Sequence, residues 1–125
     1  MGAVNQVMLV GRIGHEPELR QSTDGGTPWL RMNIATNRPT RSGEATDWHD
    51  VRVFGDQAIV CSQMLRKGSQ VHIDGQLVYE LFRNREEGER PVRTARVLAR
   101  RVTFLSDFGN RGLERPEASV RVGIA

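Results

Sequence analysis

Apolar and polar residues alternate with a period of two along most of this chain, and this alternation predicts β-strands. The clearest strand covers residues 47–55 (DWHDVRVFG). Successive side chains of a strand point to opposite faces, so its two faces carry different residues. One face has Trp48, Asp50, Arg52 and Phe54, and the other has His49, Val51 and Val53. The second face is typical of a core, whereas the first places two aromatic rings beside an arginine.

Four other segments show the same period, and each is predicted as a strand: residues 4–13, 29–37, 71–81 and 92–105. Residues 14–26 are predicted as a loop and residues 38–45 as a polar turn. Between the third and fourth strands, apolar residues at helical spacing predict a short helix over residues 57–65. Asp56 is the expected N-cap of this helix, and Gly68 is its expected C-terminal stop. Gly75 lies inside the fourth strand and indicates a bulge or bend.

The first strand is apolar on both faces, with Val7 and Leu9 on one face and Met8 and Val10 on the other. A strand that is apolar on both sides is covered on both sides. In so short a chain, one of these covers is expected to be another subunit. Val7 and Leu9 are therefore candidates for a subunit interface.

Three strands, a helix and two further strands predict an all-β fold, the OB-fold, which is a five-stranded Greek-key barrel. The helix lies between strands three and four. This fold binds oligonucleotides or oligosaccharides with its second and third strands, and with the loops between strands one and two and between strands four and five. The candidate binding residues on those two strands are Trp29, Arg31, Trp48, Arg52 and Phe54. Phe82 and the arginines that follow it lie in the loop between strands four and five.

Aromatic rings beside a cation are suited to single-stranded nucleic acid, because bases stack on the rings and guanidinium groups meet phosphates. The alternative is that Trp48 and Phe54 are covered by another layer or by a subunit. The position of both residues on the binding strands of the predicted fold favours the nucleic-acid interpretation.

An enzyme would need a different arrangement of side chains. Asp47, His49 and Asp50 are close in sequence, and His15 and His72 could be imagined as further metal ligands. On a strand, however, His49 points away from Asp50. No Cys/His pair has zinc-site spacing, and no phosphate-binding glycine-rich loop precedes a helix. We therefore predict no catalysis, no metal and no cofactor.

The composition agrees with a single intracellular domain that binds a polyanion. A chain of 125 residues is long enough for one core, and no apolar run approaches membrane-spanning length. Neither a signal peptide nor a membrane partner is expected, and Cys61 is the only cysteine, which fits a cytoplasmic location. The formal net charge is +3, and Lys67 is the only lysine, so arginine supplies the remaining basic groups.

Several segments together resemble the bacterial single-stranded DNA-binding protein family. They are VMLVGRIG (7–14), PELR (17–20), IATNR (34–38), TDWH (46–49), LRKGSQV (65–71) and GQL (75–77). The resemblance covers residues 4–105, which we take as an OB-fold DNA-binding domain. It implies a homotetramer that binds single-stranded DNA without sequence preference in replication, recombination and repair, in the cytoplasm near the nucleoid. It implies no catalysis.

Position by position, Trp48 and Phe54 match two base-stacking aromatics of that family. Phe82 matches a third, and His49 matches a histidine at the subunit interface. The candidate phosphate contacts are Arg52, Arg83, Arg85 and Arg93, and Arg31 is a further candidate DNA-binding residue. Trp29 fits the same face of the sheet, although the family usually has a smaller residue at that position.

This chain also departs from the family pattern. Thr40 stands near the position where many members place another stacking tryptophan, so that contact is expected to be missing. Residues 106–125 are predicted to be a flexible tail, and they lack the acidic tip that recruits replication and repair proteins, which makes such partners doubtful. An accessory OB-fold protein of a primosome or helicase, with weak DNA binding, is the alternative function. Its cue would be loss of the aromatic residues, which are present here.

Overall fold

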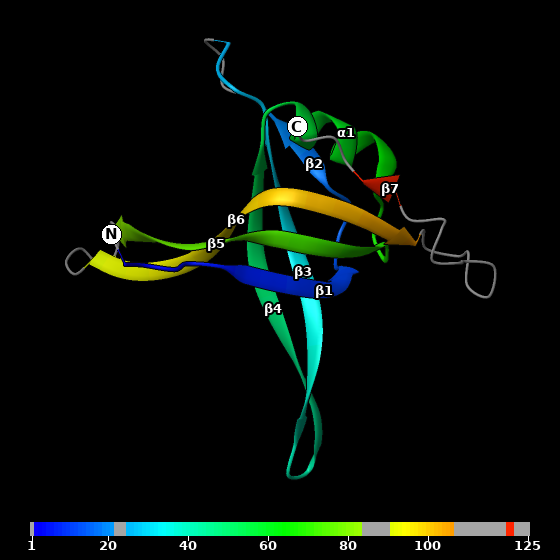
Figure 1. Ribbon diagram of the computed structural model, residues 1–125, viewed down its shortest axis with the longest axis vertical. Coiled ribbons are helices and arrows are strands. Elements are labelled where there is room, and N and C mark those ends of the chain that lie inside the picture. Colours follow the sequence, from blue (N-terminus) through cyan, green and yellow to red (C-terminus); the bar gives the residue numbers. More distant parts are fainter. Residues whose placement is uncertain (1, 22–24, 84–90, 107–119, 122–125) are drawn as a thin grey trace.

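The computed structural model describes residues 2–21, 25–83, 91–106 and 120–121. Most of these residues form strands, which are coloured along the sequence in Figure 1. The elements are β1 (Val7–Ile13), β2 (Glu18–Arg20), β3 (Trp29–Thr40), β4 (Gly43–Phe54), α1 (Asp56–Met64), β5 (Gln70–Arg83), β6 (Pro91–Ser106) and β7 (Val120–Arg121).

Five of the strands close into a barrel in the order β1-β5-β6-β4-β3. The barrel closes where β1 pairs with β3, with Arg12 opposite Ala35 and Ile13 opposite Ile34. All of these pairings are antiparallel except the short parallel contact between β4 and β6. Helix α1 lies between the third and fourth barrel strands, β4 and β5, so the predicted OB-fold is confirmed.

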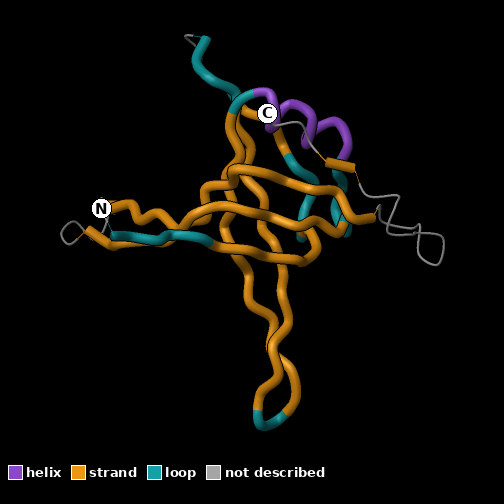
Figure 2. Tube along the Cα trace, viewed as in Figure 1, coloured by secondary structure: helices purple, strands orange, loops and turns teal. Residues whose placement is uncertain are grey.

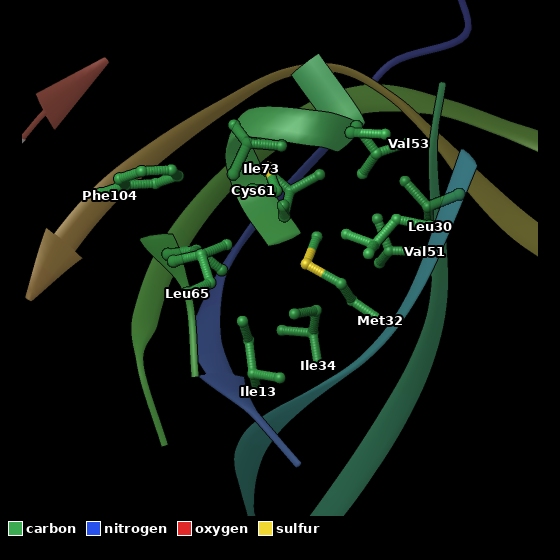
Figure 3. Close-up of a cluster of buried hydrophobic side chains, with 14 residues drawn as sticks. Ile13, Leu30, Met32, Ile34, Val51, Val53, Cys61, Leu65, Ile73 and Phe104 are labelled. Atoms are coloured by element: carbon green, nitrogen blue, oxygen red, sulfur yellow. The ribbon is translucent and has the colours of Figure 1, made fainter. Parts of the chain in front are cut away.

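The barrel interior is filled by the apolar faces that the alternation predicts. The fully buried side chains from β3 and β4 are Leu30, Met32, Ile34, Val51 and Val53, and Ile13, Cys61, Ile73 and Val102 join them from β1, α1, β5 and β6. Figure 3 shows the labelled members of this cluster gathered next to α1, which contributes Cys61. Burial of this cluster fixes which faces of β3 and β4 point outward.

Two glycines allow strands to approach each other closely. A Cβ atom on Gly11 would overlap the carbonyl oxygen of Ala35, where β1 meets β3. A Cβ atom on Gly75 would overlap the carbonyl oxygen of Leu98, and the register between β5 and β6 shifts between Asp74 and Gly75. The bulge predicted at Gly75 is therefore confirmed.

Two predictions about the ends of the helix are wrong. The N-cap of α1 is Gly55, and Asp56 is already its first residue. Gly55 has φ of 81°, a conformation that glycine adopts readily and that lets the chain turn from β4 directly into α1. The helix ends at Met64, and the next residue, Leu65, is extended, so Gly68 with φ of 94° belongs to the following turn and does not stop the helix.

Three further details differ from the sequence prediction. The predicted 14–26 loop contains the short strand β2, which pairs with β3. The predicted 38–45 turn is mostly strand, because β3 and β4 stay paired as far as Thr40 and Gly43 and form a long hairpin that extends away from the barrel (Figures 1 and 2). Val120–Arg121 pairs with β6 as β7, within the segment predicted as a flexible tail. The remainder of that tail lies outside the described residues, apart from Ser106 at the end of β6.

Within the described part of the chain, no helix has the length and apolar character needed to cross a membrane.

Candidate nucleic-acid interface

The outer faces of β3 and β4 bring the candidate binding residues into paired rows. Residues directly opposite each other in an antiparallel pair have side chains on the same face. The register gives these pairs: Trp29 with Phe54, Arg31 with Arg52, Asn33 with Asp50, and Ala35 with Trp48. We call the outward-facing set Trp29, Arg31, Trp48, Asp50, Arg52 and Phe54 the platform. Its members lie opposite the buried faces of β3 and β4, as the alternation predicts.

One end of the platform is a pair of stacked rings. Trp29 and Phe54 have ring centroids 6.3 Å apart and ring planes inclined by 26°. The guanidinium of Arg52 lies 5.1 Å from the Trp29 ring centroid, and that of Arg20 lies 5.7 Å from it. Both arginines are within cation–π distance. Phe54 is 46% exposed, so its ring is accessible to a ligand.

The other end of the platform is Trp48, which is 58% exposed. Its ring lies against Gly14, where even a Cβ atom would overlap the ring. The absence of a side chain at Gly14 therefore lets the Trp48 ring lie close to the barrel surface. Between the two aromatic ends lie the rows that contain the arginines and Asp50.

The arginines of the platform meet around one carboxylate. Asp50 lies 3.0 Å from Arg52, 3.9 Å from Arg31 and 3.8 Å from Arg96. Arg96, which also pairs with Glu80, was not among the predicted site residues. It reaches the platform because β6 runs parallel to β4, with Val97 opposite Val51, and the sequence pattern does not reveal that pairing.

A separate ion pair lies further along the β3–β4 hairpin. Arg38 donates a hydrogen bond of 2.8 Å to Asp47. This hydrogen bond and the positive charge of Arg38 hold the pKa of the Asp47 carboxyl below its usual range, so Asp47 is ionised at neutral pH.

Two hollows flank the Arg31–Arg52 row. The first, of about 240 Å³, is lined by His15, Glu16, Glu18, Arg20, Arg31 and Asn33. The second, of about 220 Å³, is lined by Arg52, Phe54, Val78, Glu80, Arg96, Val97 and Leu98. The second hollow combines the exposed Phe54 ring with apolar walls and two guanidinium groups. A base can stack on such a surface while the guanidinium groups contact the phosphate backbone of the same strand.

Arg93, another predicted DNA contact, is not on the platform. Arg93 lies 5.1 Å from the Tyr79 ring centroid. It is opposite Leu81, whereas Arg96 is opposite Val78, so Arg93 and Arg96 point to opposite faces of the β5–β6 hairpin. The side chains of Phe82 and Arg83, and the whole of Arg85, lie outside the described residues.

The predicted interface residues lie in different environments. Val7 and Leu9 pack against the core of their own chain, and the exposed pair on β1 is Met8, at 60%, and Val10, at 50%. Because Val7 and Leu9 are packed within their own chain, the exposed face of β1 is the one that carries Met8 and Val10. His49 is partly buried, and its Nε2 is hydrogen-bonded to Thr36 Oγ1 at 2.8 Å.

No group of three or more His, Cys, Asp or Glu side chains in the described residues is arranged to hold a metal ion. The groups that the site offers are aromatic rings, guanidinium groups and carboxylates, and these can bind a ligand by stacking and ion pairing.

The closed five-stranded barrel defines this protein as an OB-fold protein, and the outer face of β3 and β4 carries aromatic and arginine side chains. The model of the Single-strand binding protein family matches residues 4–105, and the chain belongs to this family. A single-stranded DNA-binding protein of Xylella fastidiosa is 35% identical over 124 residues, which cover 91% of this chain and 74% of that protein.

A solved structure also shares the fold. A structure described as a Plasmodium falciparum SSB complex with ssDNA matches with a TM-score of 0.68 and 24% sequence identity. The match covers 79% of this chain and 89% of that chain. This likeness supports the barrel architecture.

Proposed function

We propose that this protein binds single-stranded DNA without sequence preference and protects it during replication, recombination and repair. The observation that carries the proposal is the platform itself. Trp48 and the Trp29–Phe54 stack lie on one exposed face, with arginines between them. Family membership and the name of the Xylella relative point the same way.

Stacking on exposed rings explains both parts of the proposed specificity. Every base has a π-face, so stacking tolerates any sequence. In a duplex, the bases are already stacked on one another and their faces are not available. Single strands therefore fit the platform, and duplex DNA fits it poorly.

Intrinsic fluorescence gives a direct test, because both tryptophans of the chain, Trp29 and Trp48, belong to the platform. We expect oligo-dT to quench the fluorescence strongly in a saturable titration. A duplex of the same length should quench weakly under the same conditions. A mixed-sequence strand should match oligo-dT within severalfold. Equal affinity for duplex and single strand would contradict the proposal.

Affinity also distinguishes the proposal from an accessory role in a primosome or helicase. Single-strand binding at submicromolar concentrations supports DNA protection, whereas binding that stays weak at low salt supports the accessory role. The three exposed or partly exposed rings of the platform favour strong binding.

We further propose a homotetramer, in which the exposed Met8 and Val10 face of β1 and the region of His49 take part in subunit contacts. Replacing His49 with lysine should yield smaller species in light scattering, because a charge without a partner would be buried at the contact. The change also removes the hydrogen bond to Thr36, so Thr36→Val is the matched control, and it should keep the original assembly. An unchanged assembly of the His49→Lys variant would remove His49 from the interface.

A further inference from the structure

Asp50 is an acidic residue at the centre of a surface that is otherwise suited to a polyanion. Its carboxylate lies within 4 Å of three guanidinium groups, those of Arg31, Arg52 and Arg96. These arginines come from three different strands, β3, β4 and β6. A carboxylate in this position pairs with guanidinium groups that would otherwise be free to contact phosphate.

We propose that Asp50 is a built-in competitor of DNA phosphates. It pairs with Arg31, Arg52 and Arg96 in the free protein, and it keeps part of their charge from backbone phosphates when DNA binds. The inference rests on the proposed function and adds a residue that sets the strength and salt dependence of binding at the same site.

The three arginines are held to Asp50 to different degrees. Arg52 donates to both carboxylate oxygens, at 3.0 Å and 3.5 Å, and it also lies over the Trp29 ring. The contacts of Arg31 and Arg96 are longer, at 3.9 Å and 3.8 Å, which is beyond hydrogen-bond distance. The buried Nε of Arg96 makes no hydrogen bond. Arg31 is therefore attracted to Asp50 without being fixed by it and can turn towards a phosphate, whereas Arg96 is also held by its ion pair with Glu80.

The charge balance limits how strongly this cluster attracts a phosphate. Glu80 pairs with Arg96, so the cluster contains three guanidinium groups and two carboxylates and has a net charge of only one. The side chain of Asp50 is 29% exposed and those of Arg52 and Arg96 are 15% and 22% exposed, so water and salt screen these pairs less than surface pairs. Removal of one carboxylate would raise the positive charge that faces the DNA.

Asp50→Asn separates this proposal from a purely structural role, because asparagine keeps the size and one acceptor oxygen, replaces the other oxygen with an amide nitrogen, and removes the charge. Oligo-dT binding should become tighter and more dependent on salt. The slope of log affinity against log salt should steepen by about 0.7 for each additional phosphate contact on a single strand. One such contact corresponds to roughly a threefold larger loss of affinity between 50 and 200 mM salt. A residue that only positions the arginines would show weaker binding without a steeper slope.

Three other variants complete the test. Asp50→Glu keeps the carboxylate and should keep the slope of the unaltered protein. Glu44→Gln removes the same charge from an exposed position near the start of β4, and it should change the slope less than Asp50→Asn does. Asp50→Ser is a second neutral variant with a smaller side chain, and thermal unfolding would show that each variant is folded.

The possible outcomes distinguish failure of the proposed DNA binding from failure of the proposed role of Asp50. Absence of oligo-dT binding by the unaltered protein would overturn the proposed function and this inference with it. Normal binding by the unaltered protein, with no steeper slope in the folded neutral variants, would overturn the role of Asp50 alone. A steeper slope for Glu44→Gln equal to that of Asp50→Asn would also overturn it, since the effect would then reflect net charge only.

Discussion

Replacing Trp48 with alanine is expected to weaken binding to oligo-dT by roughly 1–3 kcal/mol, which corresponds to about 5- to 150-fold in Kd. The side chain is 58% exposed and its ring lies against Gly14, so a base can stack on it without rearrangement of the barrel. The slope of affinity against salt should change little, because no charge is removed. Fluorescence anisotropy of a labelled oligo-dT at several salt concentrations would measure both quantities.

Tyr79 provides a matched control for this change, because it is also an aromatic residue with 58% exposure. It lies on the face of the β5–β6 hairpin that carries Arg93, opposite the face that lines the hollow beside Phe54. Tyr79→Ala should therefore leave the Kd almost unchanged. If Trp48→Ala binds as tightly as the unaltered protein at every salt concentration, the outer face of β4 is not the DNA surface.

Leu30→Ala should lower the free energy of unfolding by about 2–5 kcal/mol, more than any other substitution discussed for this protein. Leu30 is fully buried and is paired with Val53 across β3 and β4, in the row next to Trp29 and Phe54 but on the inner face of the sheet. Truncation would leave a cavity that the closed barrel can fill only in part. Urea unfolding at a fixed protein concentration would give the difference, because association also contributes to apparent stability.

The control for Leu30 lies on the neighbouring strand. Leu19 on β2 is opposite Leu30 in the sheet, yet it is 39% exposed. Leu19→Ala removes the same atoms from a site that water already reaches, so its effect should be no more than about 1 kcal/mol. Similar losses for both variants would mean that the apolar core is not centred on the inner face of β3.

The sequence predicted the barrel well where one face of a strand is buried. In β3 and β4 the alternation of residues such as Leu30 and Val51 with polar neighbours identified the inner face, and the outer face followed from it. The pattern failed where both faces are exposed. The outer part of the β3–β4 hairpin has no buried side and was therefore predicted as a turn, and the three-residue strand β2 is too short to show a period.

The sequence identified most of the residues of the site, but it did not identify the contacts that they make with one another. The faces that carry Trp29, Arg52 and Phe54 were predicted, but their stacking depends on register, which places Trp29 opposite Phe54. Arg96 was missed because the parallel contact of β4 with β6 joins segments far apart in the chain. The meeting of three arginines at Asp50 follows from the same contact and could not be read from a single strand.

Cys61 is the only cysteine of the chain, and it is fully buried where α1 packs on the barrel core. Burial raises the pKa of its thiol to about 12, so the reactive thiolate is essentially absent at neutral pH. A maleimide dye would therefore leave the native thiol unmodified while the protein is folded. A single cysteine introduced at Ser42, in the turn of the β3–β4 hairpin, could then be labelled without removal of Cys61, and the path of a bound strand could be followed by energy transfer.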